Sequence, residues 1–151
     1  MKKKLLIIIT IFISIIMIGC SNGYESNNTK LNNLSYNKPK GKDEPEVVEK
    51  VDAKQKLYII HKYEYEGYNI RLYYRQGESY DEEYFKNTEL KYKDDTVDGI
   101  KCKSALDDDY YNYYYIPYKD DMYVIEFTGQ NKTDEAEEEF KKLVNSIKFK
   151  K

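Results

Sequence analysis

Two neighbouring segments rich in β-forming residues, Leu57–Tyr65 and Tyr68–Arg75, constrain the fold of this chain more than any other feature. The Glu66-Gly67 dipeptide between them is a plausible two-residue turn of a β-hairpin. With Tyr65 opposite Tyr68, one side of the hairpin collects an apolar set, namely Ile59, His61, Tyr63, Ile70, Leu72 and Tyr74. The opposite side collects mostly polar residues, with Tyr58, Ile60 and Tyr73 among them. A slip of one residue would mix the two sets, so the pattern predicts an antiparallel hairpin in this register.

A second hairpin is predicted further along the chain. The segments Tyr110–Tyr118 and Met122–Thr128 flank the turn sequence Lys119-Asp120-Asp121. Weaker signals predict a short helix over about residues 80–87, after a capping-box sequence, and an alternating strand over residues 100–106.

The C-terminal segment has the pattern of an amphipathic helix. Thr133 or Asp134 is the expected N-cap, and acidic residues fill the first turns. The apolar residues fall on one stripe at helical spacing, namely Ala136, Phe140, Leu143, Val144 and Ile147. Hairpins followed by such a helix predict an α+β fold: an antiparallel β-sheet of hairpins with the C-terminal amphipathic helix packed on one face.

The N-terminus predicts export. Three Lys follow Met1, and an apolar run from Leu5 to Ile18 is shorter than the roughly 20 residues that a membrane-spanning helix needs. The sequence Met17-Ile18-Gly19-Cys20 resembles the lipobox of bacterial membrane lipoprotein precursors. That resemblance implies that residues 1–19 are a signal peptide and that Cys20 is diacylated on its sulfur. It also implies a location at the cell membrane, on the extracytoplasmic face. An uncleaved anchor or a simple secretory signal is the alternative interpretation.

Loss of residues 1–19 would remove three Lys and no acidic residue, which leaves 22 basic against 27 acidic side chains and a net charge of −5. That balance argues against a nucleic-acid partner. Residues 20–46 are polar and rich in Asn, Gly and Pro, which predicts a flexible tether behind the lipidated Cys. About 26 such residues would hold the domain on the order of 28 Å from the membrane. Residues 47–151 are then the expected α+β domain.

Near the C-terminus, residues 140–149 have the pattern F-x-x-L-V-N-S-I-K-F. Together with the Tyr-rich hairpin before it, this ending resembles the PsbP/Mog1-like domains over about 100 residues. The resemblance includes no diagnostic motif and implies no particular activity.

The sequence offers little catalytic chemistry. His61 is the only histidine, and the predicted hairpin places it on the apolar side, where a structural role is the usual one. Cys102 and His61 are the one conceivable pair of nucleophile and base. A zinc site would need carboxylate ligands in addition to these two residues. The Asp-rich stretches match no calcium-loop pattern and read as turns, so neither a metal nor a cofactor is predicted.

Tyrosine is the most unusual component of the chain, with 18 residues in total and 16 of them between Tyr58 and Tyr123. Strand alternation sends Tyr111, Tyr113 and Tyr115 to one face of the second hairpin. Tyr is enriched at interfaces, so these three are the candidate aromatic contact face for an envelope protein, a peptide or a glycan. The alternative is that tyrosine reflects the composition bias of an AT-rich genome.

The sequence therefore favours a lipid-anchored extracytoplasmic protein whose domain is a non-catalytic binding or interaction module of the bacterial cell envelope. Two alternatives remain open: a small hydrolase-like envelope enzyme using His61 or Cys102, and a purely structural envelope protein.

Overall fold

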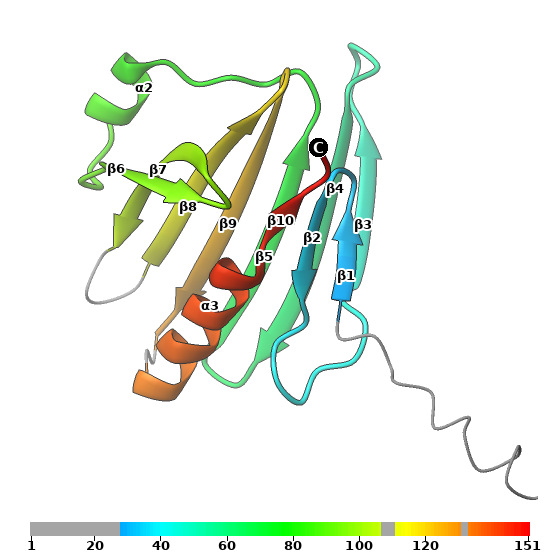
Figure 1. Cartoon of the computed structure of the whole chain (residues 1–151), viewed down its shortest axis with the longest axis vertical. Coiled ribbons are helices and arrows are strands. Elements are labelled where there is room, and N and C mark those ends of the chain that lie inside the picture. The colour runs from blue at the N-terminus through cyan, green and yellow to red at the C-terminus, as the bar shows by residue number, and fades with distance from the viewer. Residues whose placement is uncertain (1–27, 107–110, 131–132) are drawn as a thin grey trace, which may run out of the picture.

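A computed structural model describes the chain except for residues 1–27, 107–110 and 131–132, and the side chain of Tyr111 is also outside the description. The main sheet has seven antiparallel strands in the order β3-β4-β5-β9-β8-β7-β6 (Figure 1). Their bounds are β3 Glu46–Val51, β4 Leu57–Tyr65, β5 Tyr68–Arg75, β6 Lys93–Val97, β7 Ile100–Leu106, β8 Tyr111–Tyr118 and β9 Asp121–Gly129. The other regular elements of the described chain are a small three-stranded sheet and two helices. The small sheet consists of β1 Asn28–Leu31, β2 Leu34–Asn37 and β10 Lys148–Phe149, and the helices are α2 Glu82–Lys86 and α3 Asp134–Ser146.

Both predicted hairpins are present. β4 and β5 pair with Tyr65 opposite Tyr68 and His61 opposite Leu72, which is the register that the alternation of side chains predicts. In the second hairpin, Tyr118 pairs with Asp121, so Asp121 belongs to β9 and the turn is only Lys119-Asp120. The expectation of an α+β fold with an antiparallel sheet and a C-terminal helix is confirmed.

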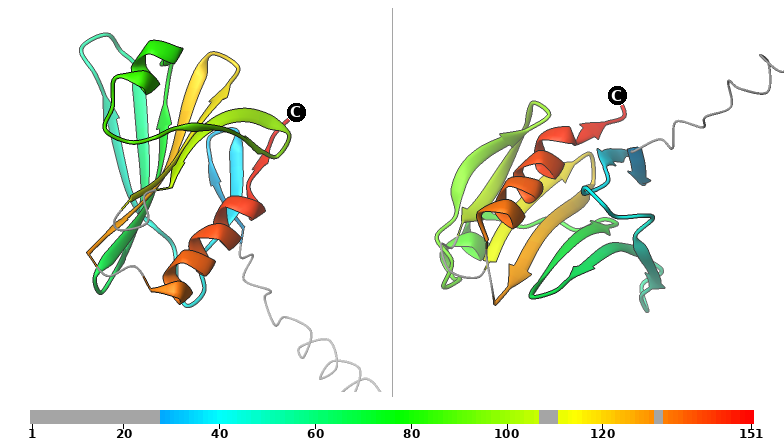
Figure 2. Two further views of the ribbon diagram at one scale, coloured as in Figure 1. Left: turned by 90° about the vertical axis from the view of Figure 1, so that its left-hand side faces the viewer. Right: turned by 90° about the horizontal axis from the view of Figure 1, so that it is seen from below.

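The main sheet has a front face, defined by Ile70, Leu72, Ile125 and Phe127, where most of the core lies. Helix α3 and the small sheet lie in front of this face, and α2 lies behind the sheet (Figures 1 and 2). Helix α3 begins at the predicted N-cap, where the Thr133 hydroxyl accepts a hydrogen bond from the Ala136 N–H at 3.2 Å. The Phe140 ring lies 5.5 Å from the ring of Phe127.

The prediction that residues 20–46 form a flexible tether is wrong from residue 28 onward. Residues 28–37 form β1 and β2, and three of their side chains are almost fully buried: Leu31, Leu34 and Tyr36. Four-residue strands show too little periodicity to be recognised in a polar, Asn-rich sequence. Moreover, β2 gains its second partner from β10 at the far end of the chain, where Phe149 pairs with Leu34.

This correction moves the start of the described domain from residue 47 to residue 28. Cys20 itself and residues 21–27 lie outside the described residues.

Candidate functional site

The back face of the main sheet is the face opposite the core, and it carries the predicted tyrosines. Tyr113 and Tyr115 alternate with Tyr114 and Ile116, and the latter two belong to the front core. Tyr111 pairs with Thr128 at the register position that continues the series. Its side chain lies outside the described part of the structure. Within that part, the alternation predicted for this strand is confirmed.

Tyr115 is buried, however, which is the opposite of what an exposed contact face requires. Only 8% of its surface is accessible. The segment that carries α2 crosses the back face here, and Tyr80, Phe85 and Tyr92 place their ring centres 5.4–5.7 Å from that of Tyr115. Tyr113 is half-buried beside it. The prediction of Tyr111, Tyr113 and Tyr115 as an exposed face is therefore wrong at Tyr115. The five-residue helix that covers it is too short to give a strong periodic signal.

The open part of the back face lies on β3, β4 and β5. A hollow of about 410 Å³ is floored by the half-buried side chains of Tyr58, Ile60 and Tyr73, and we call it the back-face hollow. Lys50, Val51 and Arg75 also line it. The Arg75 guanidinium donates to the hydroxyl of Tyr80 and lies 3.5 Å from the Glu78 carboxylate. The α2 segment is thus attached at the border of the hollow.

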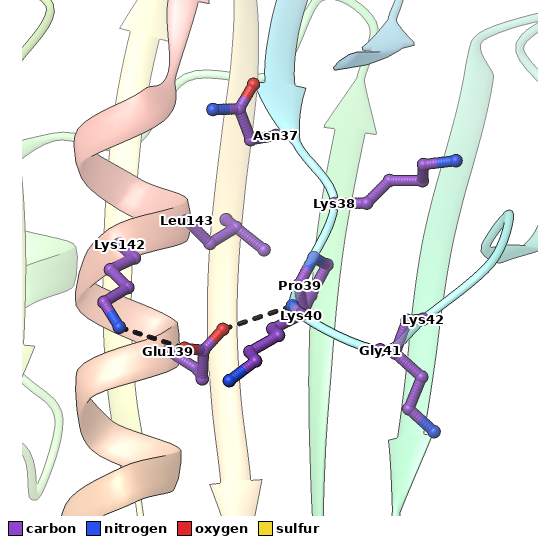
Figure 3. A pocket seen from close by; sticks show the side chains of 9 residues that line it. All are labelled: Asn37, Lys38, Pro39, Lys40, Gly41, Lys42, Glu139, Lys142 and Leu143. Atoms are coloured by element: carbon purple, nitrogen blue, oxygen red, sulfur yellow. Dashed lines mark hydrogen bonds and ion pairs between the residues drawn. The ribbon is translucent and has the colours of Figure 1, made fainter. Parts of the chain in front are cut away.

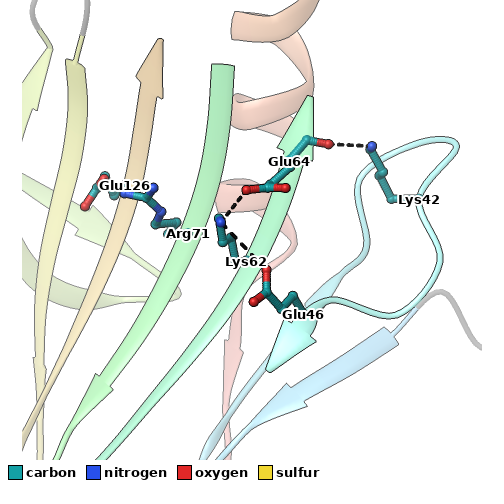
Figure 4. Close-up of polar contacts among 6 residues, drawn as sticks. All are labelled: Lys42, Glu46, Lys62, Glu64, Arg71 and Glu126. Carbon is teal, nitrogen blue, oxygen red and sulfur yellow. Dashed lines mark hydrogen bonds and ion pairs between the residues drawn. The ribbon is translucent and has the colours of Figure 1, made fainter. Parts of the chain in front are cut away.

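A charged zone borders the hollow on the same face, next to Ile60 and Tyr73 along β4 and β5. Figure 4 shows its side chains. Arg71 on β5 and Glu126 on β9 form an ion pair at 3.1 Å across the sheet. Lys62 on β4 contacts Glu64 on its own strand and lies 3.7 Å from Glu46 on β3. Such exposed pairs stabilise a fold by roughly 1 kcal/mol or less each.

A smaller hollow of about 250 Å³ lies on the other side of Tyr80, between the α2 segment and β7–β8. Phe85, Tyr115 and Met122 supply its apolar lining. Lys103 reaches across its border to Glu82 at 2.9 Å and to Asp94 at 2.7 Å. The Glu82 pair ties α2 to the sheet, and the Asp94 pair joins β6 to β7 at the border of the hollow.

A third hollow, of about 360 Å³, lies between α3 and the loop after β2 (Figure 3). Glu139 joins the two: its carboxylate accepts from the Lys40 backbone N–H and from the Lys142 ammonium, both at 3.2 Å. Partial burial raises the pKa of Glu139, but these hydrogen bonds and cations outweigh it and lower the pKa. This hollow is therefore a junction where the loop is fastened to the helix.

The structure keeps the one candidate catalytic pair apart. His61 and Cys102 are on β4 and β7, four strand spacings from each other in the sheet, which amounts to about 19 Å. The His61 Nδ1 atom lies 2.9 Å from the Tyr36 hydroxyl inside the core. Cys102 borders the smaller hollow, yet its side chain belongs to the front core, where burial raises the pKa of its thiol to about 12. These two residues do not form a nucleophile–base couple.

The described residues also contain no group of three His, Cys, Asp or Glu side chains placed to hold a metal ion. No helix within the described ranges has the length and apolar character needed to cross a bilayer. Comparisons with models of known families, with curated proteins and with solved structures give no match to this chain.

Sequence reasoning missed the back-face hollow, although its signal was present. The predicted hairpin register already places Tyr58, Ile60 and Tyr73 together on the mostly polar side. Three large apolar or aromatic side chains on a face expected to meet water are unusual, and they mark this surface.

Proposed function

We propose that this chain is a lipid-anchored, extracytoplasmic, non-catalytic binding module of the bacterial cell envelope, and that the back-face hollow holds its ligand. The observation that carries the proposal is the floor of Tyr58, Ile60 and Tyr73, half-buried on the back face beside the small buried cluster under α2, against which Tyr73 packs. Concave apolar sites with a few polar groups at the rim are the usual form of binding sites.

The division of the sheet into two faces supports this use of the hollow. We infer that the apolar stripe of α3 packs on the front face, with Ala136, Phe140, Leu143 and Val144 buried there. The front face would then be buried against α3 and would serve to stabilise the fold. The back face keeps its apolar lining open between the α2 segment and the edge strand β3.

The lining favours an extended peptide segment of an envelope protein as the ligand. Tyrosine rings provide wide apolar contact with few rotatable bonds, so little side-chain entropy is lost on binding. Lys50 and Arg75 at the rim can donate to peptide carbonyl groups, and the Asp52 carboxylate can accept from a peptide N–H. An apolar side chain of the peptide would occupy the floor.

Site-specific photo-crosslinking tests this proposal in cells. A benzophenone amino acid replaces Tyr73 in the full chain, and the matched control replaces Tyr84, which is 38% exposed on α2. We expect a discrete light-dependent adduct to a protein at Tyr73, lost when Ile60→Glu is added. Equal adducts at both positions, or none at Tyr73, would contradict the proposal. An adduct sensitive to glycosidase and free of peptide would identify a glycan instead.

The anchor requires its own experiment, because residue 20 lies outside the described residues. Cells are supplied with a labelled fatty acid, and the full chain is compared with its Cys20→Ala and Cys102→Ala variants. We expect the label to be lost only from Cys20→Ala, together with firm attachment to the membrane. A Cys20→Ala chain that remains labelled and membrane-bound would overturn the lipidation proposal.

A further inference from the structure

Strand β3 forms one edge of the main sheet and has the most exposed apolar side chains of the described chain. Val47 and Val51 are 54% and 57% exposed. Among the described strands, β3 pairs only with β4, so its outer backbone groups face away from the sheet. Such an edge can accept another strand.

The opposite edge, β6, lacks this character. Its side chains are mostly charged, and its carboxylates already have partners on β7: Asp94 contacts the Lys103 ammonium at 2.7 Å, and Asp95 accepts from the Ser104 hydroxyl at 2.8 Å. Charged side chains on an edge strand oppose pairing with another chain. Three of the six β3 residues are charged as well, and β3 differs from β6 in its three Val side chains and in the weak contact of Glu46. The contrast singles out β3.

We propose that β3 pairs antiparallel with β3 of a second copy of this chain, about a two-fold axis at Val48. In this register Val48 lies opposite its own counterpart. Glu46 of each copy lies opposite Lys50 of the other, and all of these side chains share the back face with Lys62, Ile60 and Tyr58. Two opposite-charge pairs therefore flank a central apolar pair, which is a favourable cross-strand arrangement.

Neighbouring registers are less favourable. A shift of two residues one way places Glu49 opposite Glu49 of the second copy, and like charges directly opposite are destabilising. A shift of two residues the other way moves Pro45 from the end of the ladder, opposite Val51, to a position opposite Glu49 within it, where it has no N–H to donate. The sequence from Glu46 to Lys50 thus selects one alignment out of three.

The charged groups in this alignment are available for a second copy. The Glu46 carboxylate is 60% exposed, and its contact with the Lys62 ammonium is long, at 3.7 Å, because Lys62 has a closer partner in Glu64. The ladder would extend the sheet in its own plane. The floor of the back-face hollow would therefore stay open in the dimer, although Lys50 at its rim would then contact Glu46 of the second copy instead of the ligand.

Disulfide trapping of the full chain in its membranes tests the register. Opposed residues in an antiparallel pair have Cα atoms about 4.5–5.5 Å apart, within the range that a disulfide can bridge. We expect Val48→Cys to give oxidant-dependent dimers, at least about fivefold more than Val51→Cys, whose two copies would lie about 20 Å apart. The parent chain, with Cys20 and Cys102 only, gives the background. Equal dimer yields from the two variants, or a Val48→Cys yield at background, would overturn the proposal.

Charge reversal on the Val48→Cys chain provides the second test. Lys50→Glu turns both attractive pairs into repulsions, and we expect the dimer yield to fall about fivefold or more. Adding Glu46→Lys should restore it, while Lys54→Glu, the same charge change outside the ladder, should leave it unchanged. Failure of Glu46→Lys to restore the yield, with circular dichroism reporting a folded chain, would exclude this pairing.

Discussion

The Tyr36 hydroxyl and the Nδ1 atom of His61 lie 2.9 Å apart in the core, and this contact joins the small sheet to the main sheet. The same hydroxyl lies 3.1 Å from that of Tyr63. Three polar groups from β2 and β4 thus satisfy one another where water is excluded. Burial raises the pKa of Tyr36 far above its ordinary value, so the phenol stays neutral.

Tyr36→Phe should destabilise the domain by about 1–3 kcal/mol, because His61 and Tyr63 lose the buried hydroxyl that they contact. Chemical denaturation of the full chain measures this loss. Tyr58→Phe is the matched control, since its hydroxyl contacts Asp52 at the half-exposed border of the back face, at 3.3 Å. A cost of about 0.5 kcal/mol or less is expected there. Equal costs for the two variants would argue against a structural role for the Tyr36 network.

The domain should lose stability as the pH falls below about 6.5 because of His61. Burial lowers the pKa of His61 below its ordinary value of 6.5, and the Glu44 charge opposes this only in part. Between the folded and unfolded pKa values the unfolded chain binds more protons, so acidification favours unfolding. Free energies of unfolding at pH 7.5 and 5.5 measure the effect. His61→Gln should make the difference smaller, and an unchanged difference would assign it to other groups.

Phe140→Ala should cost about 3–5 kcal/mol, the range for removing a large buried ring. Phe140 is 1% exposed, and its ring lies 6.1 Å from that of Tyr114 and 5.5 Å from that of Phe127. Lys141→Ala, on the exposed side of the same turn, should cost less than about 0.5 kcal/mol. Thermal and chemical unfolding give both values, and similar losses would mean that α3 does not rely on this ring.

Phe85→Ala should loosen the α2 segment without unfolding the sheet. Helix α2 has no fully buried residue, and Phe85 holds it to the back face through Tyr92 and Tyr115. Amide hydrogen exchange over residues 80–92 should become about tenfold faster or more, while β5 and β9 keep their protection. Lys86→Ala, an exposed change on the same helix, should leave the exchange unchanged. Exchange that accelerates equally across the whole sheet would contradict this local role.

The thiol of Cys102 should resist reagents in the folded chain. With a pKa raised to about 12 by burial, only about one thiol in 10⁴ is ionised at pH 8. A Cys20→Ala chain makes Cys102 the only thiol. Its reaction with an aromatic disulfide should be slow when folded and fast in guanidinium. Rapid reaction in the native chain would contradict this prediction and support Cys102 as a functional nucleophile.

Local patterns predicted the elements whose partners are close in the chain. The β4–β5 register follows from alternation and the Glu66-Gly67 turn, and α3 follows from its cap and its periodic apolar residues. The candidate site was less predictable. Tyr113 and Tyr115 were assigned correctly to one face, but nothing in their own strand indicates that Phe85 and Tyr80 return to cover it. Exposure depends on what packs above a face.

By itself, the sequence determined which side chains share a face of each hairpin, because strand geometry alternates side chains regardless of what surrounds them. It also determined the start of α3 and the Glu66-Gly67 turn, since capping and turn chemistry act over a few residues, but the prediction that the Asp-rich stretches are turns is wrong at Asp94-Asp95, because both residues lie within β6. Only the tertiary structure decided that residues 28–37 join the domain, that Tyr115 is buried and that β3 is an open edge. Each depends on contacts between distant segments, such as the hydrogen bond from the Ser35 hydroxyl to the Lys148 carbonyl, 113 residues away. No local pattern encodes such contacts, because they arise when separate apolar surfaces are buried against one another.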